Sequence, residues 1–373
     1  MADIQVNNLR RTFGTFVAVE NIDFHIQDGE FVFFLGPSGC GKTTTLRMIA
    51  GLLMPSSGRI DIGGRNVTYL KPRDRNVGMV FQSNVLYHHL SVYENLAYPL
   101  KVRGMARAQV RAKVQEVAEL LQIQEVLKRS TERLSAGQAQ RVAIGRMLVR
   151  DADVFLMDEP ISHLDAKLRA HMRVELRHLQ KELNRTTVFV SHDQLEAMSM
   201  ADRIAVINEG QVLQFAPPQE IFDRPATEFV AGFVGEPHMN IIDVDLNGTE
   251  VTGDGFAISV DADWLSRNRI SQGRWRLGVR PEHVSIHDVP AQGRFPAKLF
   301  AVETMGAENL FSFKIGARDF KVRATTQDSD WYVDAVDKVL YLQAAPQRVY
   351  LFDPSNGKTL AQASATEDKE GLL

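Results

Sequence analysis

The segment FVFFLGPSGCGKTTTLRMIAG, residues 31–51, constrains the fold of this chain more than any other stretch. An apolar run typical of a buried strand leads into the pattern G-x-x-x-x-G-K-T, which is followed by a helical stretch, Lys42–Ala50. Glycines in such a loop let backbone N–H groups curl around the β- and γ-phosphates of a nucleotide, and the helix N-terminus adds its dipole. Lys42 would neutralise the γ-phosphate, and Thr43 would offer its hydroxyl to Mg²⁺. The predicted nucleotide-binding residues of the loop are Gly36, Pro37, Ser38, Gly39, Cys40, Gly41, Lys42, Thr43 and Thr44.

Short apolar strands alternate with helical stretches over residues 1–235. The strands VFLM, TTVFVS and RIAVIN are separated by the helical stretches Lys167–Leu183 and Gln194–Met200. This alternation predicts an α/β domain built on a largely parallel sheet.

The strand signal disappears between Leu90 and Arg150. Apolar residues recur there at helical spacing. They are Val110, Val114, Val117 and Leu121. We therefore expect a helical insertion with one buried face at about residues 88–150.

The pattern of strands and helices in the sequence changes after the segment GEPHMN. Brief alternating strands broken by Gly, Asn and Asp follow, as in IIDVDLNGTEV and NLFSFKIGARDFKVRA. This pattern predicts a second, all-β domain over residues 236–355, with the form of a small OB-like barrel. The remaining residues, 356–373, are predicted to form a polar tail.

The composition of the chain limits the kinds of partner that it is expected to bind. The 43 basic and 46 acidic side chains give a net charge of −3, and no basic run is present, so we expect no nucleic-acid partner. No segment approaches the ~18 consecutive apolar residues that a membrane span needs. The start of the chain, MADIQVNNLRR, lacks the apolar stretch of a secretory signal. We therefore expect a cytosolic protein whose membrane role, where it has one, comes through a partner.

Two carboxylates follow the apolar strand at 154–157, namely Asp158 and Glu159. A strand that ends in carboxylates delivers them to the crevice where open α/β sheets bind ligands. Asp158 is expected to hold Mg²⁺ through water, and Glu159 to orient and deprotonate an attacking water. His192 follows another strand and is placed to contact a γ-phosphate, although a histidine in such a position is more often structural.

The single cysteine, Cys40, lies inside the phosphate loop. Nearby N–H groups and Lys42 favour a lowered thiol pKa and a reactive thiol. The alternative is that Cys40 is merely a small residue that the loop tolerates.

The order of the motifs resembles the ATP-binding subunits of ABC transporters over essentially the whole chain. The phosphate loop is followed by Gln82 in VFQSNVLYHHLSVYENLAYPL, by LSAGQ at 134–138, by the carboxylate pair, by SHLD at 162–165 and by His192. The C-terminal segments LGVRPEHVSI and VETMGAENLF further resemble the carbohydrate-importer branch, the ATPases of maltose, glycerol-3-phosphate and polyol type. The fold implied is a P-loop NTPase of the ABC cassette type, followed by a TOBE-like β domain.

The resemblance implies roles for residues outside the phosphate loop. Phe13 matches the aromatic residue that stacks on adenine, with Val19 nearby. Gln82 joins Thr43 and Asp158 in the implied Mg²⁺ site. The cofactors implied are therefore ATP and Mg²⁺.

The catalytic residues implied are Glu159, His192 and Gln82, with Gln82 coupling the γ-phosphate to the membrane subunits. The family forms a head-to-tail dimer with two ATP molecules sandwiched between cassettes. Each ATP is held by the phosphate loop of one subunit and by the LSAGQ segment of the other. The residues that complete the site of the partner are Ser135, Ala136, Gly137, Gln138, Ser162 and Asp165.

The resemblance also implies partners and a location. These are two transmembrane permease subunits, an extracytoplasmic solute-binding protein and a second ATPase subunit, identical or paralogous. The chain would be a peripheral protein at the cytoplasmic face of the membrane. The segment YHHLSVYENL lies where the permeases of the family dock.

Two positions depart from the family pattern. Ala136 replaces the usual glycine of the signature, where its methyl is expected to restrict a turn that must approach a phosphate closely. His163 places a titratable ring beside the site of the partner. One interpretation is that both replacements are neutral substitutions in an active homodimer. The other is that the chain forms a heterodimer with two unequal sites.

Ser135 and Gln138 also have the spacing of a capping box at a helix start.

The function implied is ATP hydrolysis that powers import of a sugar, a polyol, glycerol or a glycerol phosphate. The alternatives are a soluble ABC ATPase outside transport, a regulatory subunit that binds ATP without turnover, and a small-molecule kinase. Intact Lys42, Asp158, Glu159 and His192 argue against the regulatory subunit, and a kinase would lack the LSAGQ segment.

Overall fold

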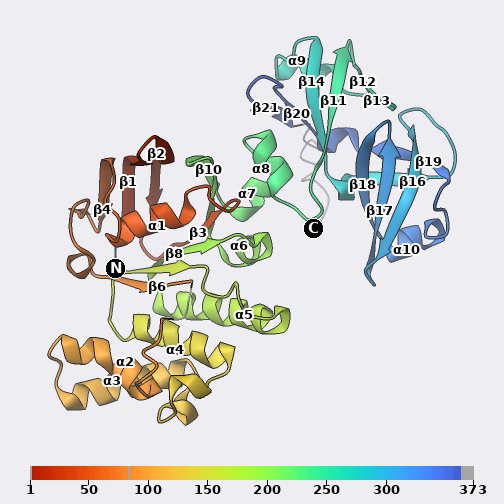
Figure 1. Cartoon of the computed structure of the whole chain (residues 1–373). Helices are drawn as coiled ribbons and strands as arrows, with labels where there is room; N and C mark the ends of the chain where they lie inside the picture. Colours follow the sequence, from red (N-terminus) through yellow and green to blue (C-terminus); the bar gives the residue numbers. More distant parts are fainter. Residues whose placement is uncertain (1, 83–84, 363–373) are drawn as a thin grey trace, which may run out of the picture. The chain divides into compact units, whose positions relative to one another are not determined.

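The computed structural model describes residues 2–82 and 85–362. The chain divides into two compact units, Met1–Gln219 and Glu220–Leu373, each of which is shown in Figure 1. The part of the predicted polar tail beyond residue 362 lies outside the described residues. Among the described residues, no helix has the length and apolar character needed to cross a membrane.

A six-stranded sheet forms the centre of the first unit, in the order β10-β9-β3-β8-β7-β6. The five strands from β9 to β6 are parallel, as predicted, and β10 adds an antiparallel edge. In chain order the strands are β3 (Phe31–Leu35), β6 (Val77–Val80), β7 (Val154–Asp158), β8 (Thr186–Ser191), β9 (Arg203–Asn208) and β10 (Gln211–Ala216).

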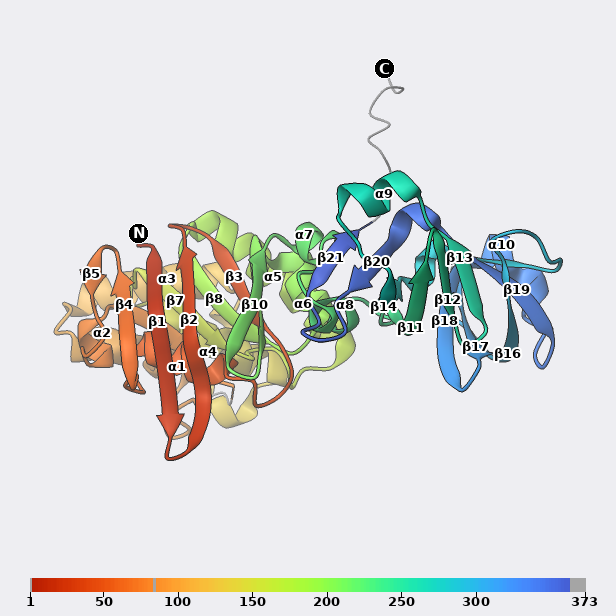
Figure 2. The same cartoon turned by 90° about the horizontal axis from the view of Figure 1, so that it is seen from above.

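A four-stranded antiparallel sheet, in the order β2-β1-β4-β5, stands beside the central sheet (Figure 2). Its strands are β1 (Ile4–Phe13), β2 (Phe16–Ile26), β4 (Ser57–Ile62) and β5 (Arg65–Asn66). Helix α1 (Lys42–Ala50) shares one hydrophobic core with both sheets. Successive side chains of β3 point to opposite faces of the sheet, so Val32 and Phe34 enter that core. Phe33, between them, stacks on Phe189 at a centroid distance of 4.5 Å.

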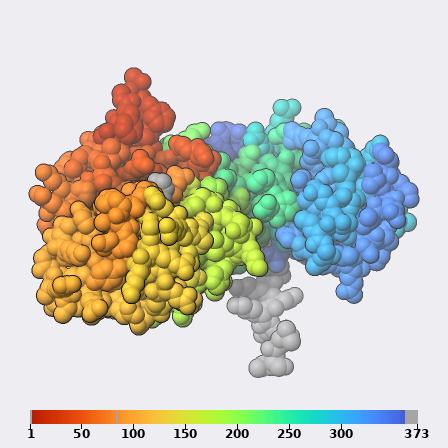
Figure 3. All heavy atoms as spheres, turned by 60° about the horizontal axis from the view of Figure 1, so that its bottom comes forward, coloured from red at the N-terminus to blue at the C-terminus, as the bar shows by residue number. Residues whose placement is uncertain are grey.

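The predicted helical insertion holds α2 (Val92–Val102), α3 (Arg107–Leu120) and α4 (Ala136–Leu148), which form the orange and yellow lobe in Figure 3. Val110, Val114 and Val117 are each at most 2% exposed, so the predicted apolar face is buried. The chain then returns to the sheet at β7, and α5 (Ala166–Leu183) and α6 (Gln194–Met200) connect the strands that follow.

The second unit is all-β, as predicted, with two antiparallel sheets ordered β13-β12-β11-β14-β20-β21 and β15-β19-β16-β17-β18. The first sheet consists of β11 (Asn240–Asn247), β12 (Glu250–Gly253), β13 (Phe256–Ser259), β14 (Gly273–Val279), β20 (Val349–Phe352) and β21 (Thr359–Gln362). The second consists of β15 (Val284–His287), β16 (Phe295–Thr304), β17 (Glu308–Ile315), β18 (Arg318–Thr325) and β19 (Val339–Ala344). The two sheets share one apolar core. Short helices α9 (Ala262–Arg267) and α10 (Thr326–Ser329) lie between strands.

The second unit begins and ends differently from the expected boundaries at 235 and 355. Helices α7 (Pro218–Asp223) and α8 (Glu228–Phe233) form polar contacts with the β strands of this unit. The Tyr350 hydroxyl, on β20, donates to the Asp223 carbonyl at 3.1 Å. Arg276 Nη1 likewise lies 2.8 Å from Glu228 Oε1. At the other end β21 pairs with β20, so ordered structure continues past residue 355. The division after Gln219 follows from these contacts.

Candidate functional site

The phosphate loop lies between β3 and α1, and its backbone leaves no room for side chains at two glycines. A Cβ on Gly36 would lie 2.1 Å from the Ile207 carbonyl oxygen. A Cβ on Gly41, at φ 108°, would lie 2.6 Å from the Ala18 carbonyl oxygen. These close approaches explain why the loop requires glycine at both ends of the G-x-x-x-x-G spacing.

Lys42 occupies the inside of this loop. Its Nζ donates to the carbonyl oxygens of Gly36, at 2.7 Å, and Pro37, at 2.8 Å. The N-cap of α1 is Gly41, which has no side chain to cap the first N–H groups of the helix. Uncapped N–H groups beside a buried ammonium make a positive cradle of the kind that binds phosphate.

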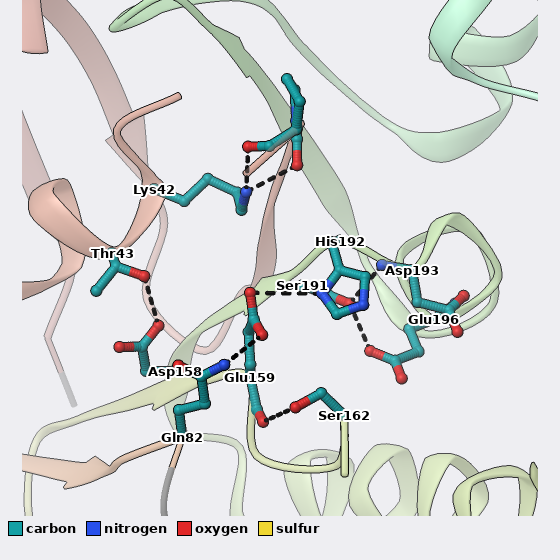
Figure 4. Close-up of polar contacts among 12 residues, drawn as sticks. Lys42, Thr43, Gln82, Asp158, Glu159, Ser162, Ser191, His192, Asp193 and Glu196 are labelled. Carbon is teal, nitrogen blue, oxygen red and sulfur yellow. Dashed lines mark hydrogen bonds and ion pairs between the residues drawn. The ribbon is translucent and has the colours of Figure 1, made fainter. Parts of the chain in front are cut away.

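Asp158 lies at the end of β7 and faces the start of α1. Thr43 Oγ1 donates to Asp158 Oδ1 at 2.8 Å, which brings the two predicted metal ligands together (Figure 4). Burial raises the pKa of Asp158, and the hydrogen bond from Thr43 offsets part of that effect. A buried carboxylate with a raised pKa is stabilised in its ionised form by a nearby cation.

Glu159 is the point at which three loops meet. Gln82 Nε2, after β6, donates to Glu159 Oε2 at 2.9 Å, and His192 Nδ1, after β8, lies 3.4 Å from Glu159 Oε1 (Figure 4). The Ser162 hydroxyl donates to the Glu159 carbonyl at 3.0 Å. These loops meet because β6, β7 and β8 are adjacent parallel strands whose carboxyl ends share one edge of the sheet. Glu159 itself has φ 45°, a left-handed conformation uncommon outside glycine.

His192 lies between two residues that anchor its loop. The Ser191 hydroxyl donates to Glu196 Oε2 at 2.5 Å and accepts from the Asp193 N–H at 2.9 Å. Glu196 is buried, and desolvation raises its pKa. The Asp193 side chain caps α6. Sequence reasoning missed Glu196, although Asp193 and Glu196 have the i, i+3 spacing of a capping pattern.

The LSAGQ segment forms the predicted capping box at the start of α4. The Ser135 hydroxyl accepts from the Gln138 N–H at 3.3 Å, and Gln138 Oε1 accepts from the Ser135 N–H at 3.1 Å. Ala136 is exposed, is the first residue of the helix and does not have positive φ. The expectation that its methyl strains this turn is therefore wrong within the single chain, because a helical residue accommodates a Cβ without cost. Gly137 is the position with little space, since a Cβ there would lie 3.0 Å from Leu168 Cδ2.

The other predicted residues lie around this centre. Val19 is buried, and its Cγ2 would lie 3.5 Å from a Cβ on Gly41, whereas Phe13 is 46% exposed at the end of β1. Asp165 caps α5 by accepting from the Leu168 N–H at 2.9 Å. Ser38 and Gly39 are exposed, and Pro37 and Thr44 are partly buried.

His163 lines a hollow within its own chain. The hollow has a volume of about 530 Å³ and also exposes Asp158, Gln82 and Ser162. The ring therefore lines the same hollow as the carboxylate and the amide of its own site. The sequence placed it only beside the site of the partner.

The surroundings of Cys40 disfavour a reactive thiol. The side chain is buried, and burial raises the pKa of the thiol even though the Lys42 ammonium lies 3.8 Å from the sulfur and partly offsets the shift. The thiolate is the nucleophilic form of cysteine, so a raised pKa lowers reactivity. The structure therefore contradicts the first interpretation of Cys40 and agrees with a small buried residue.

Comparisons with known proteins identify both units. A family model described as ABC transporter matches residues 19–162, and one described as TOBE domain matches residues 277–352. Among solved structures, cbiO1 from Clostridium perfringens is 29% identical with a TM-score of 0.55, covering 58% of this chain and 89% of its own. A dimeric ATP-binding cassette bound to ADP and Pi is also 29% identical, with a TM-score of 0.53, covering 58% of this chain and 98% of its own.

Curated relatives match nearly the whole chain. The sn-glycerol-3-phosphate import ATP-binding protein UgpC of a Ruegeria species is 42% identical, covering 97% of this chain and 100% of its own length. The trehalose/maltose import ATP-binding protein MalK of Thermococcus litoralis is 41% identical, covering 96% and 100%. These relatives favour a role in import over a soluble ATPase outside transport. The resemblance read from the motif order is confirmed, and the chain belongs to the family of ATP-binding, ATP-hydrolysing subunits of ABC importers.

Proposed function

We propose that this chain hydrolyses ATP at the site around Glu159 and that the reaction powers import of a carbohydrate-type solute through membrane permeases. The observation that carries the proposal is the contact of the Glu159 carboxylate with both Gln82 and His192. A carboxylate held by an amide and an imidazole is oriented as a general base for water. Lys42 and the uncapped start of α1 lie on the same edge of the sheet and neutralise the phosphates.

Mg²⁺ fits the residues beside this base. Thr43, Gln82 and Asp158 supply hydroxyl, amide and carboxylate oxygens, which are the hard ligands that Mg²⁺ prefers. The direct hydrogen bond between Thr43 and Asp158 holds two of these groups together. When bound, Mg²⁺ neutralises charge on the β- and γ-phosphates. In this proposal Phe13 stacks on adenine, with Val19 beside the loop.

The second half of each site comes from a second ATPase subunit. Ser135, Ala136, Gly137 and Gln138 at the start of α4, together with Ser162 and Asp165, face the ATP of that subunit. The N-terminus of α4 supports this role, because helix N-terminal donors form an anion site. Native mass spectrometry of the assembled transporter decides whether the second subunit is identical or paralogous.

The permease partners dock in an apolar groove between the sheet and the helical insertion. The groove has a volume of about 690 Å³, and its lining includes Leu52, Met79, Phe81, Tyr87, Tyr98 and Arg146. Arg146 lies over the Tyr87 ring, 4.4 Å from its centroid, so an aromatic and cationic wall faces the docked segment. Gln82 lies close by in sequence and contacts Glu159, which links the groove to the base.

The solute follows from the relatives rather than from this chain. They are named for import of sn-glycerol-3-phosphate and of trehalose and maltose, so we propose a solute from the sugar, polyol, glycerol and glycerol-phosphate group. The solute would contact the permeases and an extracytoplasmic binding protein, and the chain would lie at the cytoplasmic face of the membrane. Uptake of labelled members of this group, measured with and without the gene, identifies the solute.

The substitution Glu159→Gln tests the hydrolytic part of the proposal. It keeps the shape of the side chain and removes the base, so turnover should fall by about 10²-fold or more while ATP binding is retained. Glu182→Gln, an exposed glutamate on α5, is the matched control. Unchanged turnover in Glu159→Gln would show that Glu159 is not the base.

A further inference from the structure

Arg169, in the first turn of α5, joins two loops that the proposed function places in different ATP sites. Its Nη2 donates to the carbonyl oxygens of Ser162 and Leu164, each at 3.0 Å. Its Nη1 lies 3.4 Å from Asp193 Oδ2. The guanidinium is partly buried, with 29% of its side chain exposed, so these contacts are less screened than those of a surface ion pair.

Each end of this bridge is anchored to a residue of the site. On one side, the Ser162 hydroxyl donates to the Glu159 carbonyl at 3.0 Å. On the other side, Asp193 directly follows His192, and its second oxygen, Oδ1, accepts from the N–H groups of Leu195 and Glu196 at 2.8 and 3.2 Å. The Asp193 carboxylate is therefore held by α6 through one oxygen and by Arg169 through the other.

The contacts form a closed circuit around the base. It runs from Glu159 through Ser162, Arg169 and Asp193 to His192, which returns to Glu159 Oε1 at 3.4 Å. Figure 4 shows Ser162 and His192 contacting Glu159 from different loops. A shift of the Ser162–Leu164 carbonyls changes the acceptors of Arg169, which alters how firmly Asp193 holds the His192 loop. Arginine suits this position because a planar fork of five donors can serve acceptors on two loops, whereas lysine is a point donor.

We propose that Arg169 is a positioning residue that couples the Ser162–Leu164 loop, which faces the ATP of the partner, to His192 at the ATP of its own chain. The inference rests on the proposed function, which places Ser162 at the second site. It implies that occupancy of one site is transmitted to the histidine of the other through Arg169, beside the direct contact of Ser162 with Glu159. Loss of Arg169 should therefore weaken cooperativity between sites as well as turnover.

The test measures ATP hydrolysis by the assembled transporter that contains this chain against ATP concentration. Arg169→Ala should lower kcat by about tenfold with KM little changed, and should reduce the Hill coefficient towards one. Arg169→Lys should recover only part of kcat. Asp193→Asn keeps an N-cap acceptor but loses the charge that faces Arg169, so it should resemble Arg169→Ala. Lys181→Ala, which removes a positive charge from the exposed end of α5, is the matched control and should behave as wild type.

A double variant, Arg169→Ala with Asp193→Asn, separates coupling from general damage. Because both changes break one link, the double variant should be no slower than either single variant. Losses that multiply, or an unchanged Hill coefficient in Arg169→Ala, would overturn the proposal. Full activity in Arg169→Ala with loss of turnover in Glu159→Gln would refute this inference alone, whereas full activity in Glu159→Gln would refute the proposed function.

Discussion

Ser135 has one role within its own chain and a second in the proposed dimer, and two substitutions separate them. Ser135→Ala removes the side-chain acceptor for the Gln138 N–H, which lies 3.3 Å away. Loss of an N-cap hydroxyl costs about 1 kcal/mol. For a unit of about 200 residues, this cost lowers the melting temperature by about 2–4 °C.

Ser135→Asp should leave the melting temperature unchanged and lower the rate of ATP turnover. Aspartate caps helices as well as serine does, so the melting temperature should stay near that of the wild type. In the proposed dimer, however, its carboxylate would face the γ-phosphate of the partner's ATP. Two unit charges at roughly 4 Å repel by about 4 kcal/mol at an effective dielectric of 20. Each 1.4 kcal/mol is about tenfold, so turnover should fall by about a thousandfold.

Thermal melts of the nucleotide-free protein and steady-state ATPase rates measure the two effects. Thr227→Asp is the matched control, because Thr227 caps α8 in the second unit by accepting from the Val230 N–H at 3.2 Å. A Ser135→Asp protein that hydrolyses ATP at the wild-type rate would refute the placement of this segment beside a phosphate. An unchanged melting temperature in Ser135→Ala would refute the stabilising role of the cap.

Three further predictions concern residues around the loop and the signature. Because burial raises the pKa of Asp158, its ionisation destabilises the fold as pH rises from the unfolded pKa through the folded pKa. In melts without nucleotide, Asp158→Asn should therefore match wild type below that window and melt higher above it, and it should lack ATPase activity. Buried Cys40 should react with a maleimide at least about tenfold more slowly in the native protein than in urea, by mass spectrometry. Ala136→Gly should cost less than about 1 kcal/mol in melts. Its ATPase rate should be unchanged, and a large increase would show that the methyl obstructs the partner.

The sequence predicted those features that depend on local chemistry. The spacing of Val110, Val114 and Val117 requires one apolar helix face, and that face is buried. Ser135 and Gln138 form their capping box because both partners lie within one helical turn. β7 ends at Asp158, directly after its apolar run, so the carboxylates reach the edge of the sheet.

Features that depend on distant neighbours could not be predicted in the same way. Gly137 faces Leu168 of another helix, and Arg169 meets an aspartate 24 residues further along the chain. The raised pKa of the Cys40 thiol depends on burial, which outweighs the nearby ammonium and is not visible in the motif. Ala136 was misjudged because the pattern marks a glycine without showing that the residue is helical.

The geometry of the cap leaves Ser135 free for a second role in the proposed dimer. A hydroxyl carries one donor and two acceptor lone pairs, and the cap uses Ser135 only as an acceptor, from the Gln138 N–H. Its O–H therefore remains able to donate to a phosphate oxygen while the helix start stays capped. Aspartate reproduces the acceptor but supplies no donor and adds a negative charge. The stability of α4 and the affinity for the phosphate of the partner can thus change independently at this one position, and this independence makes Ser135→Asp a test of the dimer rather than of the fold.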